Sequence, residues 1–216
     1  MREQILQKVL DKKSVAIVRG VYGEDCVKLA QALYEGGIEL LEVTFDQSKP
    51  ELLERTSDTI RQLTERLGDK MIFGAGTVTS VHMLELAKNA GARFIVSPDI
   101  NEAVIRATVA AGMVSMPGAL TPTEVVTAHA WGADFVKLFP AGSMGVGYLK
   151  AVTAPLNHIP MLAVGGVNEK NIADFLAAGA VGAGVGGNLV NKTWIANGEF
   201  EKITALAREF AEKAGV

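Results

Sequence analysis

The chain repeats one unit along its length: an amphipathic helix, a stop made of small residues, and a short apolar strand. Five of the helix-to-strand connections read ALYEGGIELLEVTF, AKNAGARFIVSP, TVAAGMVSMPG, AHAWGADFVKLFP and FLAAGAVGAGVGG. In each of them a glycine stands where a helix C-cap is needed, and the strand follows almost at once. The unit recurs roughly every 20 to 30 residues, which is the spacing of βα units.

Eight strands are predicted, and all are short and apolar. They alternate little between polar and apolar residues, as expected of a parallel sheet whose outer face is covered by helices. No linker or change of composition interrupts the eight units, so we predict a single (β/α)8 TIM barrel over residues 1–216 with an extra N-terminal helix. A doubly wound open sheet is the rival architecture. The predicted strands lie near residues 14–19, 40–45, 71–77, 93–98, 114–118, 135–139, 161–165 and 181–186.

Three helix starts carry capping signals. Thr121 and Glu124, separated by three positions, form the pattern of a capping box. Thr79 or Ser80 would cap the helix after the third strand, and Asn168 the helix after the seventh.

Composition excludes several classes of function. The net charge of −3 gives no basic footprint for nucleic acid or for an anionic membrane. The N-terminal segment lacks the apolar core of a signal peptide, and the most apolar run is too short and too glycine-rich to span a bilayer. The single cysteine, Cys26, cannot form an internal disulfide. We therefore expect a cytoplasmic protein in which Cys26 is a small core residue.

Two charged residues interrupt apolar strands. Lys137 stands between Val136 and Leu138, and Glu42 stands between a leucine and a valine. A buried ammonium is costly unless it is paired or loses its proton. Because side chains alternate along a strand, the apolar neighbours suit the outer face, and both Lys137 and Glu42 are predicted to point into the barrel.

This pair has two interpretations. The first is a structural ion pair, although such pairs seldom add net stability. The second is a Schiff-base lysine with Glu42 as its proton shuttle. An amine attacks a ketone only when it is unprotonated, and desolvation lowers the pKa of a lysine. Glu42 should then lie within reach for proton transfer, but without holding Lys137 in its charged form.

Glycine pairs stand at the ends of the last two strands. The seventh ends in Gly165 and Gly166, and the eighth in Gly186 and Gly187, followed by Asn188. In (β/α)8 barrels the loops after these two strands often hold phosphate, because glycine amides can approach its oxygens closely. The glycines therefore predict a phosphate site, with simple chain turns as the alternative. No motif indicates a metal.

The motifs EVTF, GAGTV, FIVSP, MPGALTPTE, KLFP and GGV follow one another over nearly the whole chain. With them the chain resembles the 2-keto-3-deoxy-6-phosphogluconate/4-hydroxy-2-oxoglutarate (KDPG/KHG) aldolase family. The resemblance implies a homotrimeric class I aldolase barrel that uses no metal and no cofactor. It also implies a small keto acid phosphate as substrate.

The resemblance further assigns roles to individual residues. Lys137 of KLFP would form the Schiff base, and Glu42 of EVT would be the general acid/base. Thr77 of GAGT would hold the pyruvate carboxylate together with Arg19. The remaining expected substrate-binding residues line the pocket or bind phosphate: Pro98, Phe139, Val164, Gly165, Gly166, Gly187 and Asn188.

Some positions depart from the family pattern. Many gluconate-cleaving members have an arginine for the pyruvyl carboxylate where this chain has Asp46, which leaves that task to Arg19 and to backbone amides. Many also have a threonine where this chain has Val164, as in the galactonate-preferring branch, and a serine where it has Asn188. The preferred sugar epimer is therefore open.

The expected reaction is cleavage of KDPG to pyruvate and glyceraldehyde 3-phosphate, or of 4-hydroxy-2-oxoglutarate to pyruvate and glyoxylate. One alternative is an aldolase that prefers the phosphogalactonate epimer. Others are a different phosphate barrel, such as an epimerase or synthase, and a barrel that binds a phospho-ligand without catalysis. The last would keep the glycines but need neither Lys137 nor Glu42.

Overall fold

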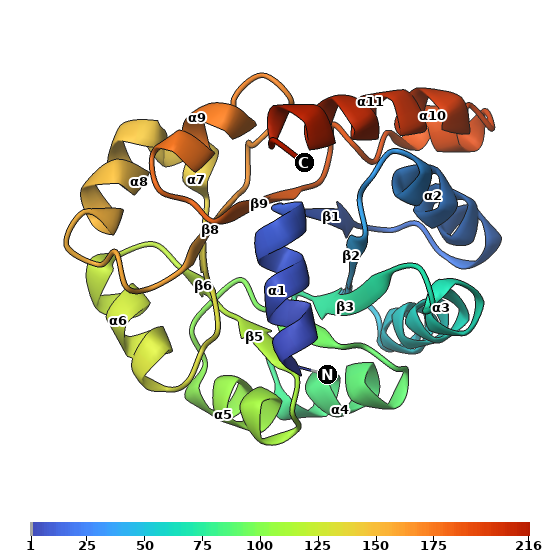
Figure 1. The fold of residues 1–216 in the computed structure, drawn as a ribbon. Coiled ribbons are helices and arrows are strands. Elements are labelled where there is room, and N and C mark those ends of the chain that lie inside the picture. The colour runs from blue at the N-terminus through green and yellow to red at the C-terminus, as the bar shows by residue number, and fades with distance from the viewer. Residues whose placement is uncertain (1) are drawn as a thin grey trace.

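The computed structural model describes residues 2–216 and shows a ring of parallel strands surrounded by helices (Figure 1). The strands are β1 (Ser14–Val18), β2 (Leu40–Thr44), β3 (Ile72–Gly76), β4 (Phe94–Val96), β5 (Val114–Met116), β6 (Gly118–Ala119), β7 (Val136–Leu138), β8 (Met161–Val164) and β9 (Gly182–Val185). The helices are α1 (Arg2–Lys12), α2 (Gly23–Glu35), α3 (Pro50–Leu67), α4 (Val81–Asn89), α5 (Glu102–Ala110), α6 (Pro122–Ala130), α7 (Ala141–Met144), α8 (Val146–Thr153), α9 (Ile172–Ala177), α10 (Lys192–Ala196) and α11 (Phe200–Lys213).

The order of the strands identifies the architecture. It runs β5-β4-β3-β2-β1-β9-β8-β7-β6, and every pairing is parallel. The two ends of this order, β5 and β6, are consecutive parts of one strand on either side of Pro117. Chain order therefore runs once around the ring. This confirms the predicted (β/α)8 barrel and excludes the doubly wound sheet, in which the strand order reverses.

The fifth strand differs from the prediction of one continuous segment over 114–118. Proline has no amide hydrogen to donate to a ladder, and Pro117 separates β5 from β6. The carbonyl of Pro117 instead accepts a hydrogen bond of 2.8 Å from the amide of Lys137. The break thus ties the fifth strand to β7 at the position of the buried lysine.

The strands bury apolar side chains on both faces. Leu40 and Phe135 belong to a cluster inside the ring, whereas Leu41 packs outward with the surrounding helices. Helix α1 lies across one end of the barrel (Figure 1), and its Ile5 and Val9 join the inner cluster. The extra N-terminal helix therefore closes the barrel at the end where the strands begin, and the opposite end stays available for a site.

Most of the predicted helix boundaries are confirmed. A glycine with positive φ follows each of the five helices whose stops were recognised, and this conformation favours glycine. Ser80 caps α4 by accepting a hydrogen bond from the amide of Met83, and Thr121 and Glu124 form the complete capping box of α6. The five glycines are Gly37, Gly91, Gly112, Gly132 and Gly179.

The predicted cap at Asn168 is wrong. Helix α9 begins at Ile172, with Asn171 at its N-cap position. The Asn168 side chain instead accepts a hydrogen bond from the amide of Lys170, within a turn that precedes the helix. Asn171 accepts from the Asn168 amide and donates to the carbonyl of Gly166, so the turn is bound to the glycine pair after β8.

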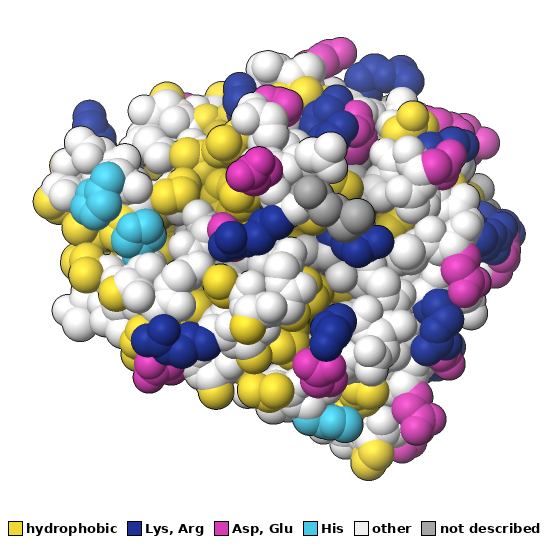
Figure 2. Space-filling view, turned by 60° about the horizontal axis from the view of Figure 1, so that its bottom comes forward, with side chains coloured by type: hydrophobic (Ala, Val, Ile, Leu, Met, Phe, Trp, Pro, Cys, Tyr) yellow, Lys and Arg dark blue, Asp and Glu magenta, His cyan; other side chains and the backbone are white. Residues whose placement is uncertain are grey.

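The remaining surface and core expectations concern charge, membrane spans and Cys26. On the face in Figure 2, acidic and basic side chains are interspersed rather than separated into fields of one sign. Within residues 2–216 no helix combines the length and apolarity needed to cross a membrane. Cys26 is buried in α2, and burial raises the pKa of its thiol to about 12, as expected of an inert core cysteine.

Candidate active site

A cavity of about 430 Å³ opens at the carboxyl ends of the strands. All eleven residues predicted to catalyse the reaction or bind substrate line it: Arg19, Glu42, Thr77, Pro98, Lys137, Phe139, Val164, Gly165, Gly166, Gly187 and Asn188. The fold thus brings together residues that are up to 169 positions apart, from Arg19 to Asn188. Gly186, of the predicted glycine pair, also lines the cavity, and four further lining residues were not predicted: Ile17, Val167, Asn168 and Gly184. Ile17 could have been found, because it shares a strand face with Arg19.

Lys137 lies in the middle of β7 and points into this cavity. Its residue is only 8% exposed, and its Nζ lies 4.9 Å from the centre of the Phe139 ring. Burial lowers the pKa of the Lys137 ammonium, the Glu42 carboxyl group opposes this shift, and Arg19 adds to it. The amine is therefore more readily available in its neutral, nucleophilic form than an exposed lysine would be.

Glu42 lies on the inner face of β2 and is 2% exposed. Its carboxyl group rests against Gly76 of β3, at the place where any larger residue would have its Cβ. Burial raises the pKa of Glu42, although the charges of Lys137 and Arg19 act in the opposite direction. A raised pKa lets a carboxyl group keep its proton at a higher pH than an exposed glutamate would, as a general acid requires.

Lys137 and Glu42 do not form a structural ion pair. Among the ion pairs of residues 2–216, defined by nitrogen–oxygen distances up to 4.0 Å, this pair is absent. The two groups nonetheless line one cavity and influence each other's pKa. The acid thus lines the same cavity as the amine without pairing with it, which is the arrangement that a proton shuttle requires.

Thr77 has an unusual backbone conformation directly after β3. Its φ of 58° lies in the left-handed region, which is rarely adopted by a β-branched residue. Such a conformation costs of order 1–3 kcal/mol and occurs preferentially at functional sites. The strain directs a threonine side chain to the cavity lining, at the position where the carboxylate of a substrate was expected.

Arg19 and Asp46 differ in their relation to the cavity. Arg19 follows β1 and lines the mouth, where its side chain is exposed. Asp46 does not line the cavity, and it accepts a hydrogen bond of 2.9 Å from the amide of Ser48. The hydrogen bonds from Ser48 hold the pKa of Asp46 below its usual value. Arg19 is thus the arginine that this cavity offers to an anionic substrate.

The glycine pair after β8 is held in one conformation by its neighbours. Gly165 and Gly166 have φ values of 88° and 78°, which favour glycine. The carbonyl of Gly165 accepts a hydrogen bond of 2.6 Å from the amide of Gly142, and that of Gly166 one of 3.0 Å from Asn171. Both carbonyls of the pair are thus hydrogen-bonded, and the two glycines line the cavity without side chains that would exclude a phosphate group.

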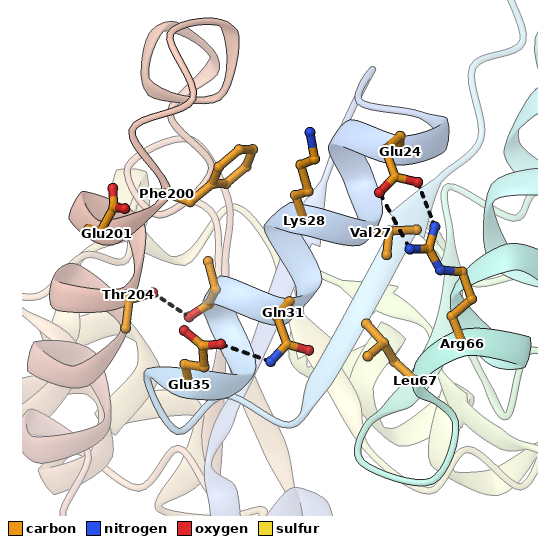
Figure 3. A pocket seen from close by; sticks show the side chains of 11 residues that line it. Glu24, Val27, Lys28, Gln31, Glu35, Arg66, Leu67, Phe200, Glu201 and Thr204 are labelled. Carbon is orange, nitrogen blue, oxygen red and sulfur yellow. Dashed lines mark hydrogen bonds and ion pairs between the residues drawn. The ribbon is translucent and has the colours of Figure 1, made fainter.

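A second cavity of similar volume, about 430 Å³, lies outside the barrel between α2, α3 and α11 (Figure 3). Glu24 and Arg66 form an ion pair of 2.6 Å across it, and Gln31 donates a hydrogen bond of 2.8 Å to Glu35. Its lining residues come from helices and not from strand ends. The polar groups suited to catalysis are in the first cavity.

Comparisons with known proteins identify the family of this chain. The family model described as KDPG and KHG aldolase matches residues 5–206. The 2-dehydro-3-deoxy-6-phosphogalactonate aldolase of Escherichia coli is 35% identical over 81% of this chain and 83% of its own. The 2-dehydro-3-deoxy-phosphogluconate aldolase of Treponema pallidum is 34% identical over 89% of each chain.

A solved structure shows the same likeness in three dimensions. KDPG aldolase from Legionella pneumophila, with pyruvate captured as a covalent carbinolamine, superimposes with a TM-score of 0.82. It is 27% identical, and the superposition covers 94% of this chain and 96% of that one. On these matches the chain belongs to the KDPG and KHG aldolase family, whose members are lyases that cleave carbon–carbon bonds.

Proposed function

We propose that this protein is a class I aldolase that cleaves a 2-keto-3-deoxy-6-phospho sugar acid into pyruvate and glyceraldehyde 3-phosphate. The observation that carries the proposal is the environment of Lys137. Its amine is buried, its pKa is lowered, and Glu42 lines the same cavity without forming an ion pair with it. A non-catalytic phospho-ligand barrel would need neither of these residues.

The reaction follows from these two groups. The neutral amine of Lys137 adds to the C2 ketone, and uptake of a proton with loss of water gives an iminium ion. Glu42 removes the proton of the C4 hydroxyl, the C3–C4 bond breaks, and its electron pair moves to the iminium to give an enamine. Glyceraldehyde 3-phosphate leaves. Glu42 then protonates the enamine at C3, and water releases pyruvate and Lys137. General acid–base catalysis of this kind contributes roughly 10²–10⁴-fold.

The lining of the cavity supports a distribution of binding roles. The pyruvyl carboxylate would lie near Thr77 and Arg19, and Pro98 and Phe139 would enclose the carbon chain. The phosphate would lie at the glycine-rich part of the rim, formed by Gly165, Gly166, Gly187 and Asn188. Val164, at the end of β8, would contact the part of the substrate where the epimers differ.

The phosphogalactonate epimer is a second candidate substrate, favoured by the apolar Val164 and by the relative from Escherichia coli. Pyruvate release should therefore be measured with KDPG, its galactonate epimer and 4-hydroxy-2-oxoglutarate side by side. Turnover of at least one by the wild type, and of none by Lys137→Ala, is the expected result. A Lys137→Ala variant that cleaves at the normal rate rules out the proposal.

A homotrimer is part of the proposal. Three large apolar side chains are exposed on segments that follow the carboxyl ends of strands, namely Val81, Phe139 and Met144. Contiguous exposed apolar surface marks an interface, and we place these three residues in the contact between subunits. Light scattering should give three times the mass of the chain, and a monomer would contradict this assignment.

A further inference from the structure

Thr44, the last residue of β2, has a buried hydroxyl group without a partner. The residue is 1% exposed, and its Oγ1 has no hydrogen bond within residues 2–216. An unpaired buried hydroxyl destabilises the folded state, and valine has nearly the same shape without this penalty. The hydroxyl therefore calls for an explanation beyond packing.

The geometry of β2 directs Thr44 toward the same space as Glu42. Val43 and Phe45 belong to the cluster that packs against the helices. By the alternation of a strand, Glu42 and Thr44 face the barrel interior together. Thr44 is in register with Gly76 on β3, and the Glu42 carboxyl group rests against that same glycine. Paired strands lie about 4.7–4.9 Å apart, so the Thr44 side chain and the Glu42 carboxyl group both lie beside Gly76.

The proposed reaction asks Glu42 to alternate between its protonated and ionised forms. The charged groups that act on it are Lys137 from β7 and Arg19 after β1, and neither forms an ion pair with it. A permanently charged partner at hydrogen-bond distance would hold Glu42 in its ionised form. A hydroxyl can rotate, so that it donates to a carboxylate and accepts from a carboxylic acid.

We propose that Thr44 is a positioning residue for Glu42, and that its hydroxyl donates a hydrogen bond to the Glu42 carboxylate in the ionised steps of the cycle. The inference rests on the proposed function of Glu42 as proton carrier. In this structure the Thr44 hydroxyl is not yet bonded to the Glu42 carboxyl group, and within residues 2–216 no other group occupies it.

The test separates proton transfer from Schiff-base formation. Exchange of the pyruvate methyl protons for deuterium in D₂O, followed by NMR, needs both Lys137 and Glu42. Borohydride trapping of pyruvate on the enzyme needs only Lys137. For Thr44→Val we expect trapping as in the wild type and exchange slowed about tenfold or more. A donor to a carboxylate lowers its pKa, so its removal should shift the acidic limb of the exchange profile upward by about one pH unit.

Two further variants serve as controls. Thr44→Ser keeps the hydroxyl and should restore the profile. Ser14→Ala removes another buried hydroxyl without a partner, at the start of β1 and the opposite end of the barrel. Both Ser14→Ala and Thr44→Val should raise Tm, but only Ser14→Ala should leave the exchange rate unchanged. A Thr44→Val profile that coincides with the wild type, or an equal shift in Ser14→Ala, overturns the inference. Absence of trapping and exchange in the wild type would instead refute the proposed function.

Discussion

Gly76 offers a direct test of the position of Glu42. A Cβ at Gly76 would occupy the place of the Glu42 carboxyl group, so Gly76→Ala must displace that group. Restoring van der Waals contact needs a shift of more than about 1 Å, and a misplacement of about 1 Å can lower a rate by about 100-fold. Gly76 does not line the cavity, so we expect the loss in kcat and little change in KM. Overpacking should also lower the unfolding free energy by about 1–3 kcal/mol.

Pyruvate release under saturating substrate and thermal unfolding together check this prediction. Gly147→Ala is the matched control, because a Cβ at Gly147 meets open space and the residue lies in α8. Alanine is a better helix former than glycine by about 1 kcal/mol, so this control should be active and slightly more stable. If Gly76→Ala kept the kcat of the wild type, proton transfer would not depend on the position of the Glu42 carboxyl group beside Gly76.

Three further predictions concern charge, strain and packing. Glu42→Gln removes the carboxylate that raises the pKa of Lys137. The pH of half-maximal borohydride trapping should therefore move further below the 10.5 of an ordinary lysine. An upward move would show that Glu42 does not raise the pKa of Lys137. Thr77→Gly should raise the unfolding free energy by about 1 kcal/mol and weaken pyruvate binding, as measured by thermal unfolding and by KM. A Cβ at Gly74 would overlap the Phe94 ring, so Gly74→Ala should destabilise the barrel by about 1–3 kcal/mol. Adding Phe94→Leu to the same protein should recover part of the loss in Tm, because the smaller side chain leaves room for the Cβ.

The architecture could be predicted because its signals are periodic and local. Glycines with positive φ follow the helices where the sequence placed the stops, and the apolar strands follow within a few residues. Lys137 and Glu42 were recognisable because each interrupts an apolar strand, where a charge needs a chemical reason. Alternation along the strand then gave the direction of both side chains.

Other features depend on contacts between distant segments and could not be predicted. Asn168 and Asn171 are equally good N-cap residues by type. In the structure Asn171 is the N-cap residue of α9, and its side chain donates a hydrogen bond to the Gly166 carbonyl. The left-handed conformation of Thr77 contradicts the local preference of a β-branched residue. The separation of Lys137 from Glu42 depends on the registers of several strands and on the space beside Gly76.

The proposed reaction requires that one buried amine, that of Lys137, adds to the ketone of pyruvate. Incubation with pyruvate and borohydride, followed by digestion and mass spectrometry, should place a single reduced adduct on Lys137. Lys137→Ala should carry none, and exposed lysines such as Lys88 should stay unmodified. An adduct on another lysine, or an unmodified wild-type chain that still cleaves its substrate, would contradict the account.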